Sequence, residues 1–318
     1  MRMFLIALPA AVLSAQRAPQ DALVERPTIS ASEAPLAPVV RAHLEQAIQA
    51  RDYLKAEQIL VHELDRTPTS RPLLTLAGSV FFLDGKYLNA AVAMKKAEAI
   101  APLDDQSRFT LAMSYVVLSR QDWARPELDK LRQKNPDHPL YLYWLARLDY
   151  DEQQYPAATD KLERVIAIDP GNMKAYDNLG LCYEALGRLD EAIKTYQRAV
   201  DLNRQAKAVS PWPPLNLGTL LAKMEQLDDA EKYLRESLRA DPRFAEAHYQ
   251  LGVLLEKRGR DEQAILELEQ AAALNAAYPQ PHYALGRIYR RAGNITRAAA
   301  ELAQFERLKQ AKPEKRTR

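Results

Sequence analysis

Residues 173–200 read MKAYDNLGLCYEALGRLDEAIKTYQRAV, and the small residues of this segment return along most of the chain at a fixed spacing. Gly180 is followed twelve residues later by Ala192, and neighbouring segments repeat this pair. The first members lie 34 residues apart, except for one step of 38, and are Gly78, Ala112, Ala146, Gly180, Gly218, Gly252 and Gly286. Such a period is typical of stacked supersecondary units and not of one globular core.

Each unit has the pattern of two helices joined by a short turn. Tyr176, Leu179 and Gly180 follow one another at helical spacing, so they share one helix face. Gly187 marks the end of this first helix, and Asp190 stands near the start of the second. Small residues on both helices allow the two backbones to approach closely.

Prolines close the units, again at intervals of 34, at Pro68, Pro102, Pro136 and Pro170. This combination of small, large apolar and closing residues closely resembles the tetratricopeptide repeat (TPR) family over about residues 37–312. The resemblance implies an all-α fold, a right-handed superhelical solenoid of about eight antiparallel helix hairpins with a concave inner surface. The expected units start near residues 37, 71, 105, 139, 173, 211, 245 and 279.

Two places depart from the pattern. The first unit carries Leu44 where a small residue belongs, which fits a terminal unit that needs only one packed side. Between the fifth and sixth units the register gains four residues around Pro211-Trp212-Pro213-Pro214. Pro214 leaves the start of the next helix open, and the insert is interpreted as an elongated turn, a hinge or a partner-contact loop.

The ends of the chain differ from the repeats. Arg2 and the apolar run from Met3 to Leu13 predict a signal peptide over residues 1–18. We expect a proline-rich flexible linker at 19–36 and a basic disordered tail at 313–318. The protein is thus predicted to be exported, either periplasmic or secreted, with a cytoplasmic location as the alternative.

Composition limits the partners. The 44 Lys+Arg and 42 Asp+Glu nearly cancel, so the whole molecule is no polyanion binder. Ten basic and three acidic residues from 279 to 318 make this end basic, but that charge argues for at most a peripheral membrane contact and does not favour nucleic acid. Cys182 is the only cysteine, which excludes an intrachain disulfide.

No catalytic motif is present, so we predict neither an enzyme nor a cofactor. His248 and His282 occupy corresponding places 34 residues apart, but both fall at a packed helix position. They are interpreted as partly buried structural histidines, and no metal site is predicted.

Ligand contacts are expected on the face of each first helix that lies opposite its packed face. The sixth positions carry Trp144, Asn178, Asn216 and Gln250. Asn178 and Asn216, each followed by Leu-Gly, resemble the asparagine ladder in the superhelix of O-linked N-acetylglucosamine transferases. A carboxamide suits an extended peptide backbone because it donates and accepts hydrogen bonds. The alternative is that these carboxamides stabilise their own helices.

The fifth positions carry aromatic residues, Phe109, Tyr143, Tyr249 and Tyr283. Such rings supply contact area in a groove, although they could equally pack against the neighbouring unit. Near the C-terminal end, Arg287, Arg290 and Arg291 are expected to form a basic pocket with the tyrosines that takes a carboxylate.

These features predict a non-enzymatic interaction scaffold or adaptor that binds an extended segment of another protein in its concave groove. The alternative is a structural or assembly component of a cell-envelope complex that associates through its outer faces or ends.

Overall fold

The computed structural model describes residues 34–311, which form sixteen α-helices and no β-strand. The chain divides into two compact units, residues 1–170 and 171–318. The described helices of the first unit are α2 (Pro38–Gln49), α3 (Tyr53–Arg66), α4 (Arg71–Leu83), α5 (Tyr87–Ile100), α6 (Asp105–Val117), α7 (Gln121–Lys134), α8 (Pro139–Asp151) and α9 (Tyr155–Ile168). Those of the second are α10 (Met173–Ala185), α11 (Leu189–Arg204), α12 (Trp212–Lys223), α13 (Leu227–Ala240), α14 (Ala245–Lys257), α15 (Asp261–Leu274), α16 (Pro279–Arg291) and α17 (Ile295–Ala311).

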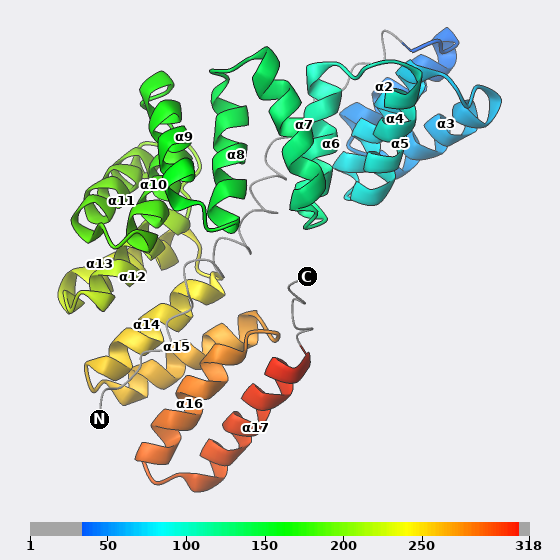
Figure 1. Ribbon diagram of the computed structural model, residues 1–318. Coiled ribbons are helices and arrows are strands. Elements are labelled where there is room, and N and C mark those ends of the chain that lie inside the picture. The colour runs from blue at the N-terminus through cyan, green and yellow to red at the C-terminus, as the bar shows by residue number, and fades with distance from the viewer. Residues whose placement is uncertain (1–33, 312–318) are drawn as a thin grey trace. The chain divides into compact units, whose positions relative to one another are not determined.

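The helices form hairpins that stack in chain order within each unit (Figure 1). The prediction of an all-α array of helix hairpins is confirmed. Each first helix begins at the expected start of its unit or one residue later. Each closing proline that the sequence analysis named lies two residues after a helix end, where it cannot extend the helix.

The first helices of the hairpins form the more closely packed layer. Within the second unit α10 touches α12, α12 touches α14, and α14 touches α16; in the first unit α4 touches α6. Contacts of similar extent between second helices do not occur among residues 34–311. Since closer contacts mark the inner side of a curved array, the first helices supply the inner surface of each unit.

The small residues of the repeat lie where the two helices of a hairpin meet. Ala192 is fully buried, and a Cβ added to Gly180 would come within 2.5 Å of the Tyr196 ring. At the equivalent place a Cβ on Gly252 would lie 2.7 Å from Leu268. These approaches are too short for a methyl group, so glycine sets the distance between the helices.

The turn inside each hairpin contains one residue with a left-handed backbone, at the same place in all eight hairpins. Glycine supplies it at Gly85, Gly187, Gly259 and Gly293. The other four turns use residues with a side chain, which are Arg51, Ser119, Gln153 and Glu225. A residue with a Cβ is strained in this region by roughly 1 kcal/mol, so these four turns are less favourable than the glycine turns.

We expect Gln153→Gly to raise the free energy of unfolding by about 1 kcal/mol, because it relieves this strain at an exposed residue. The matched reverse change, Gly187→Ala, should lower it by a similar amount, because a Cβ there meets nothing within 4 Å and only the backbone is affected. Urea unfolding followed by circular dichroism measures both. Equal stability of the two variants would contradict the strain account.

The hydrophobic core of the first hairpin includes residues that precede its first helix. The predicted signal peptide 1–18 and basic tail 313–318 lie outside the described residues, and so does the predicted linker 19–36 except for its last three residues. Of those, Ala34 and Leu36 are buried in one cluster with Leu44, so they do not behave as linker. Arg41 holds this approach by donating from Nη2 to the carbonyl of Ala34 at 3.0 Å.

The four-residue insert is a fixed turn. The Asn203 side chain donates to the Ser210 carbonyl and accepts from the Ser210 amide, both at 2.8 Å. The Ser237 hydroxyl donates to the Pro211 carbonyl at 2.8 Å, and the Trp212 ring packs edge-on against Phe244 at 4.8 Å. The helix begins at Trp212 despite the following prolines, since the first turn of a helix needs no amide donors. Of the interpretations raised above, these bonds favour the elongated turn.

In the part of the chain that the structure describes, no helix is both long and apolar enough to cross a lipid bilayer.

Candidate functional site

The carboxamide positions of the inner layer are already partly used. Asn178 donates from Nδ2 to the Lys174 carbonyl at 2.8 Å. It therefore stabilises its own helix, which was the alternative to peptide binding. Asn216 donates to the Asp177 carboxylate at 3.0 Å and so joins α12 to α10. Gln250 is buried, and its Nε2 has no hydrogen-bond partner among the described residues. Of the three predicted carboxamides, Gln250 therefore keeps an unused donor.

The predicted aromatic positions pack mainly against other rings. In the first unit Tyr143 lies edge-on to Trp144 at 5.6 Å, and both are buried. Phe109 on α6 lies 5.8 Å from Tyr141 on α8 and remains partly exposed. The Phe109 contact joins two neighbouring hairpins, whereas Tyr143 packs against the next residue of its own helix.

In the second unit Tyr249 on α14 lies 5.2 Å from Tyr278, just before α16, and Tyr283 lies 5.2 Å from Phe305 on α17. Burial raises the pKa of Tyr249 to about 12 and that of Tyr278 well above its ordinary value. Both phenols therefore stay protonated at neutral pH and can donate a hydrogen bond.

The basic pocket expected at the C-terminal end is occupied by the protein's own carboxylates. Arg287 donates from Nε to Glu256 Oε1 at 2.9 Å and makes a second, shorter bond through Nη2. Arg291 pairs with Asp261 at 2.8 Å and with Glu256 at 3.3 Å. An incoming carboxylate would have to displace these acids, so the structure removes the basis for an acidic ligand there. Arg290 is exposed and forms no ion pair with another described residue.

The two corresponding histidines make the same contact one repeat apart. His248 lies 2.6 Å from Glu267, and His282 lies 2.7 Å from Glu301, each pair joining the two helices of one hairpin. The hydrogen bond with Glu267 raises the pKa of His248, and the Pro242 carbonyl at 3.0 Å adds to it. No group of three or more metal-ligating side chains occurs in residues 34–311.

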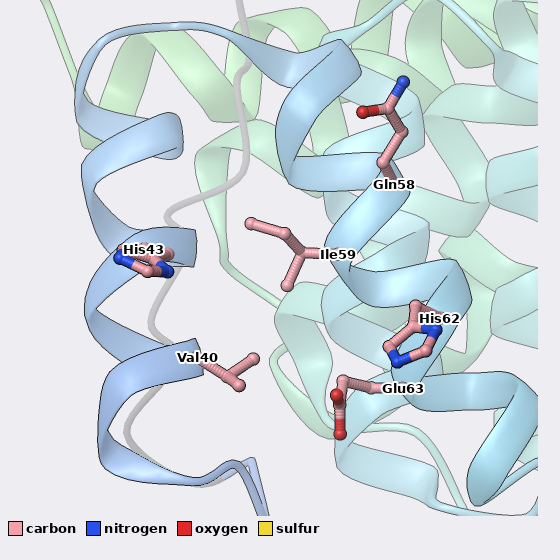
Figure 2. Close-up of a pocket in the computed structure, with 6 residues that line it drawn as sticks. All are labelled: Val40, His43, Gln58, Ile59, His62 and Glu63. Atoms are coloured by element: carbon pink, nitrogen blue, oxygen red, sulfur yellow. The ribbon is translucent and has the colours of Figure 1, made fainter.

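The first hairpin carries a cavity of about 300 Å³ between α2 and α3, which the sequence did not indicate. Figure 2 shows Val40 and Ile59 directed into the space between the helices, with His62 and Glu63 farther along α3. His43 and Gln58 complete the lining. Half of the lining side chains are exposed and the other half are partly buried, so the cavity is a surface feature.

Sequence reasoning missed a second set of polar groups on the inner layer of the second unit. Like Gln250 Nε2, three more buried atoms have no hydrogen-bond partner within residues 34–311, and these are Thr219 Oγ1, Tyr278 Oη and Gln280 Oε1. Thr219 and Gln280 stand at the ninth and second positions of their hairpins, both on the face assigned to ligands. The sequence positions of Thr219 and Gln280 are enough to place them on this face, but only the folded structure shows that their side chains lack partners.

Comparisons with known proteins agree with this architecture. Family models described as "Tetratricopeptide repeat" match residues 171–243 and 215–280, and one for "Anaphase-promoting complex, cyclosome, subunit 3" matches 124–199. The chain therefore contains the repeats of the tetratricopeptide repeat family. Proteins of this family bind protein or peptide partners.

Curated relatives cover only parts of the repeat array. Hsp70-Hsp90 organizing protein 1 of Glycine max is 28% identical over 130 residues, 41% of this chain and 20% of that protein. TPR repeat-containing protein YpiA of Bacillus subtilis is 25% identical over 187 residues, 57% of this chain and 43% of that protein. The chain thus spans about a fifth of the length of the first of these relatives and less than half of the second.

One relative is named as an enzyme, the probable UDP-N-acetylglucosamine–peptide N-acetylglucosaminyltransferase SPINDLY of Hordeum vulgare. It is 31% identical over 97 residues, but these make up only 10% of its length. The family fold is generally a non-enzymatic scaffold, and nothing in this short match indicates catalysis by the present chain.

Solved structures show the same fold. A tetratricopeptide repeat protein from Parabacteroides merdae superimposes with a TM-score of 0.64 at 17% identity, covering 74% of this chain and 92% of that one. PilW, a type IV pilus biogenesis factor, superimposes with a TM-score of 0.58 at 20% identity, covering 64% and 92%. At such identities the likeness shows the fold alone.

Proposed function

We propose that the protein is an interaction scaffold that binds an extended segment of a partner protein along the inner layer of residues 171–318. The observation that carries the proposal is a set of buried polar atoms on or next to this layer that have no partner among residues 34–311, Thr219 Oγ1, Gln250 Nε2, Tyr278 Oη and Gln280 Oε1. Burying a polar group without a partner costs about 1–3 kcal/mol, so such atoms are uncommon unless ordered water or a ligand satisfies them.

An extended peptide fits these atoms by its chemistry. Its backbone carries alternating donors and acceptors, and the four side chains offer both kinds of group. The surrounding ion pairs hold the layer in shape, since Lys257 binds both the Ala222 carbonyl at 3.2 Å and Glu225 at 2.6 Å. A rigid surface loses less conformational entropy when it binds.

The test separates binding from stability. Full-length protein is screened against a phage-displayed library of random nine-residue peptides, and the double variant Thr219→Val/Gln250→Leu is screened beside it. Both changes remove unpartnered polar groups at nearly constant volume, so stability should stay equal or rise, while peptide affinity should fall about tenfold or more.

A screen in which the wild-type protein enriches no peptide would contradict the proposed function. An unchanged affinity of the double variant would remove these two side chains from the binding surface.

We also propose that the protein is exported, on the strength of the apolar run Met3–Leu13 behind Arg2. N-terminal sequencing of the mature protein tests this directly, because export predicts a first residue near 15–19, whereas an intact Met1 would argue for the cytoplasm.

A further inference from the structure

Glu246 is a partly buried carboxylate that no cation of the described chain neutralises. It stands in the first turn of α14, and none of the ion pairs within residues 34–311 includes it. Burial raises the pKa of Glu246, and the charge of Asp241 raises it further, while a bond to its own backbone amide acts in the opposite sense. The carboxylate thus bears a desolvation cost that a cation would offset.

Aromatic residues stand near Glu246 along the chain and just before the next hairpin. Tyr278 is close enough for the charge of Glu246 to contribute to the raised pKa of its phenol, and the Tyr249 ring lies 5.2 Å from the Tyr278 ring. Phe244, two residues before Glu246, packs against Trp212 at 4.8 Å. Electron-rich ring faces beside a carboxylate are the usual surroundings of a bound organic cation.

Two of the unpartnered polar atoms can accept a hydrogen bond. Gln280 Oε1 can only accept a hydrogen bond, and the buried Tyr278 Oη is able to accept one. Gln280 occupies the same second position of its hairpin as Glu246, one repeat farther on, and their helices, α14 and α16, are in contact. A ligand group that satisfies all three residues must carry several N–H donors.

Most cations of the neighbouring helices are held by other acids, and Arg290, which forms no ion pair within the described chain, lies in the last turn of α16, at the opposite end of that helix from Gln280. Glu256 and Asp261 hold Arg287 and Arg291, and Glu225 holds Lys257. Glu246 is therefore the group that sets the sign of the ligand charge at this part of the surface.

We infer that Glu246, Tyr249, Tyr278 and Gln280 form a pocket for one basic side chain, lysine or arginine, of the bound partner segment. The inference rests on the proposed function and adds a residue preference to it. Both basic side chains supply the positive charge and the N–H donors that the pocket needs. Arginine offers five donors in a planar fork, whereas lysine offers three at a single point. If Gln280 and Tyr278 accept hydrogen bonds from the ligand in addition to Glu246, arginine is the preferred side chain.

The experiment uses the same random nonapeptide library with the full-length protein and with Glu246→Gln, which keeps the size of the side chain. The wild-type protein should enrich peptides that carry a basic residue at one fixed position. Glu246→Gln should bind such peptides about tenfold to a hundredfold more weakly, the usual loss when a charge-assisted bond is removed. Glu262→Gln, an exposed acid on α15, is the matched control and should keep the preference.

Synthetic versions of the enriched peptide then carry arginine, lysine or the neutral arginine analogue citrulline at that position. Tight binding of the arginine or lysine peptide and weak binding of the citrulline peptide support the pocket and identify the preferred head group. Enriched peptides without a basic residue, or equal binding of the citrulline peptide, would overturn this inference and leave the proposed function standing. Failure of the wild-type protein to enrich any peptide would overturn both.

Discussion

Replacing Gly180 with alanine is expected to lower the free energy of unfolding by about 2 kcal/mol, although alanine is the better helix former. The new methyl group would lie 2.5 Å from two carbons of the fully buried Tyr196 ring, so α10 and α11 would have to separate. Urea unfolding followed by circular dichroism measures the loss.

The chain itself supplies the compensating change. At the equivalent place two other hairpins combine alanine with leucine, Ala112 with Leu128 and Ala146 with Leu162, and all four side chains are buried. Gly180→Ala/Tyr196→Leu should therefore be at least 1 kcal/mol more stable than the sum of the two single changes indicates. Additive effects would show that the ring contact does not determine the helix spacing.

Removing the Glu231 carboxylate should have a comparable effect for an electrostatic reason. Glu231 is buried on α13 and accepts hydrogen bonds from Arg258 at 2.7 Å and from Arg260 at 2.8 Å, with a further ion pair to Arg235. Glu231→Ala would leave three arginines around an empty place, at a cost of about 2 kcal/mol after allowance for their partial exposure.

The pH dependence of stability provides a second measurement. Burial opposes ionisation of Glu231, but the bond from Arg260 and the charges of Arg235 and Arg258 outweigh it, so its pKa is lowered. This stabilisation is present above the carboxyl pKa of the unfolded chain, near 4.5, and is lost as the pH falls through the folded value. The variant should therefore lose less stability than wild type on acidification.

Asp229→Ala is the control for this change, since Asp229 is exposed on the same helix. It should alter stability by less than about 0.5 kcal/mol. A loss at Glu231 no larger than that of the control would show that the cluster between α13 and the following hairpin contributes nothing to stability.

The fold could be predicted well from the sequence because small and large residues recur at fixed positions of each repeat. A small residue at the place of Gly180, followed by alanine at the place of Ala192, indicates a close contact between the two helices of a hairpin. This contact is local, so it can be predicted for each hairpin without knowledge of the others. The turns were harder to predict from residue type, because Gln153 and Glu225 adopt the left-handed backbone that glycine supplies at the same place in other hairpins.

The candidate site was predicted only in outline. Helical spacing placed Gln250 and Tyr249 on the inner layer, but it could not show that Glu256 neutralises Arg287 and Arg291 from the preceding hairpin. Spacing also gave no reason to single out Glu246, because an unpaired charge is recognised only when all its neighbours are known. Charge pairing depends on side-chain conformations across hairpins, which a linear pattern does not contain.

The clamped turn between α11 and α12 has a practical consequence for labelling this protein. Asn203 and Ser210 close the loop at its base, while residues 204–209 between them are exposed. A fluorophore or an epitope tag placed within 205–209 would leave the base bonds and both flanking helices untouched. Such a reporter would sit one hairpin before Glu246, where it could signal ligand arrival without joining the contact itself.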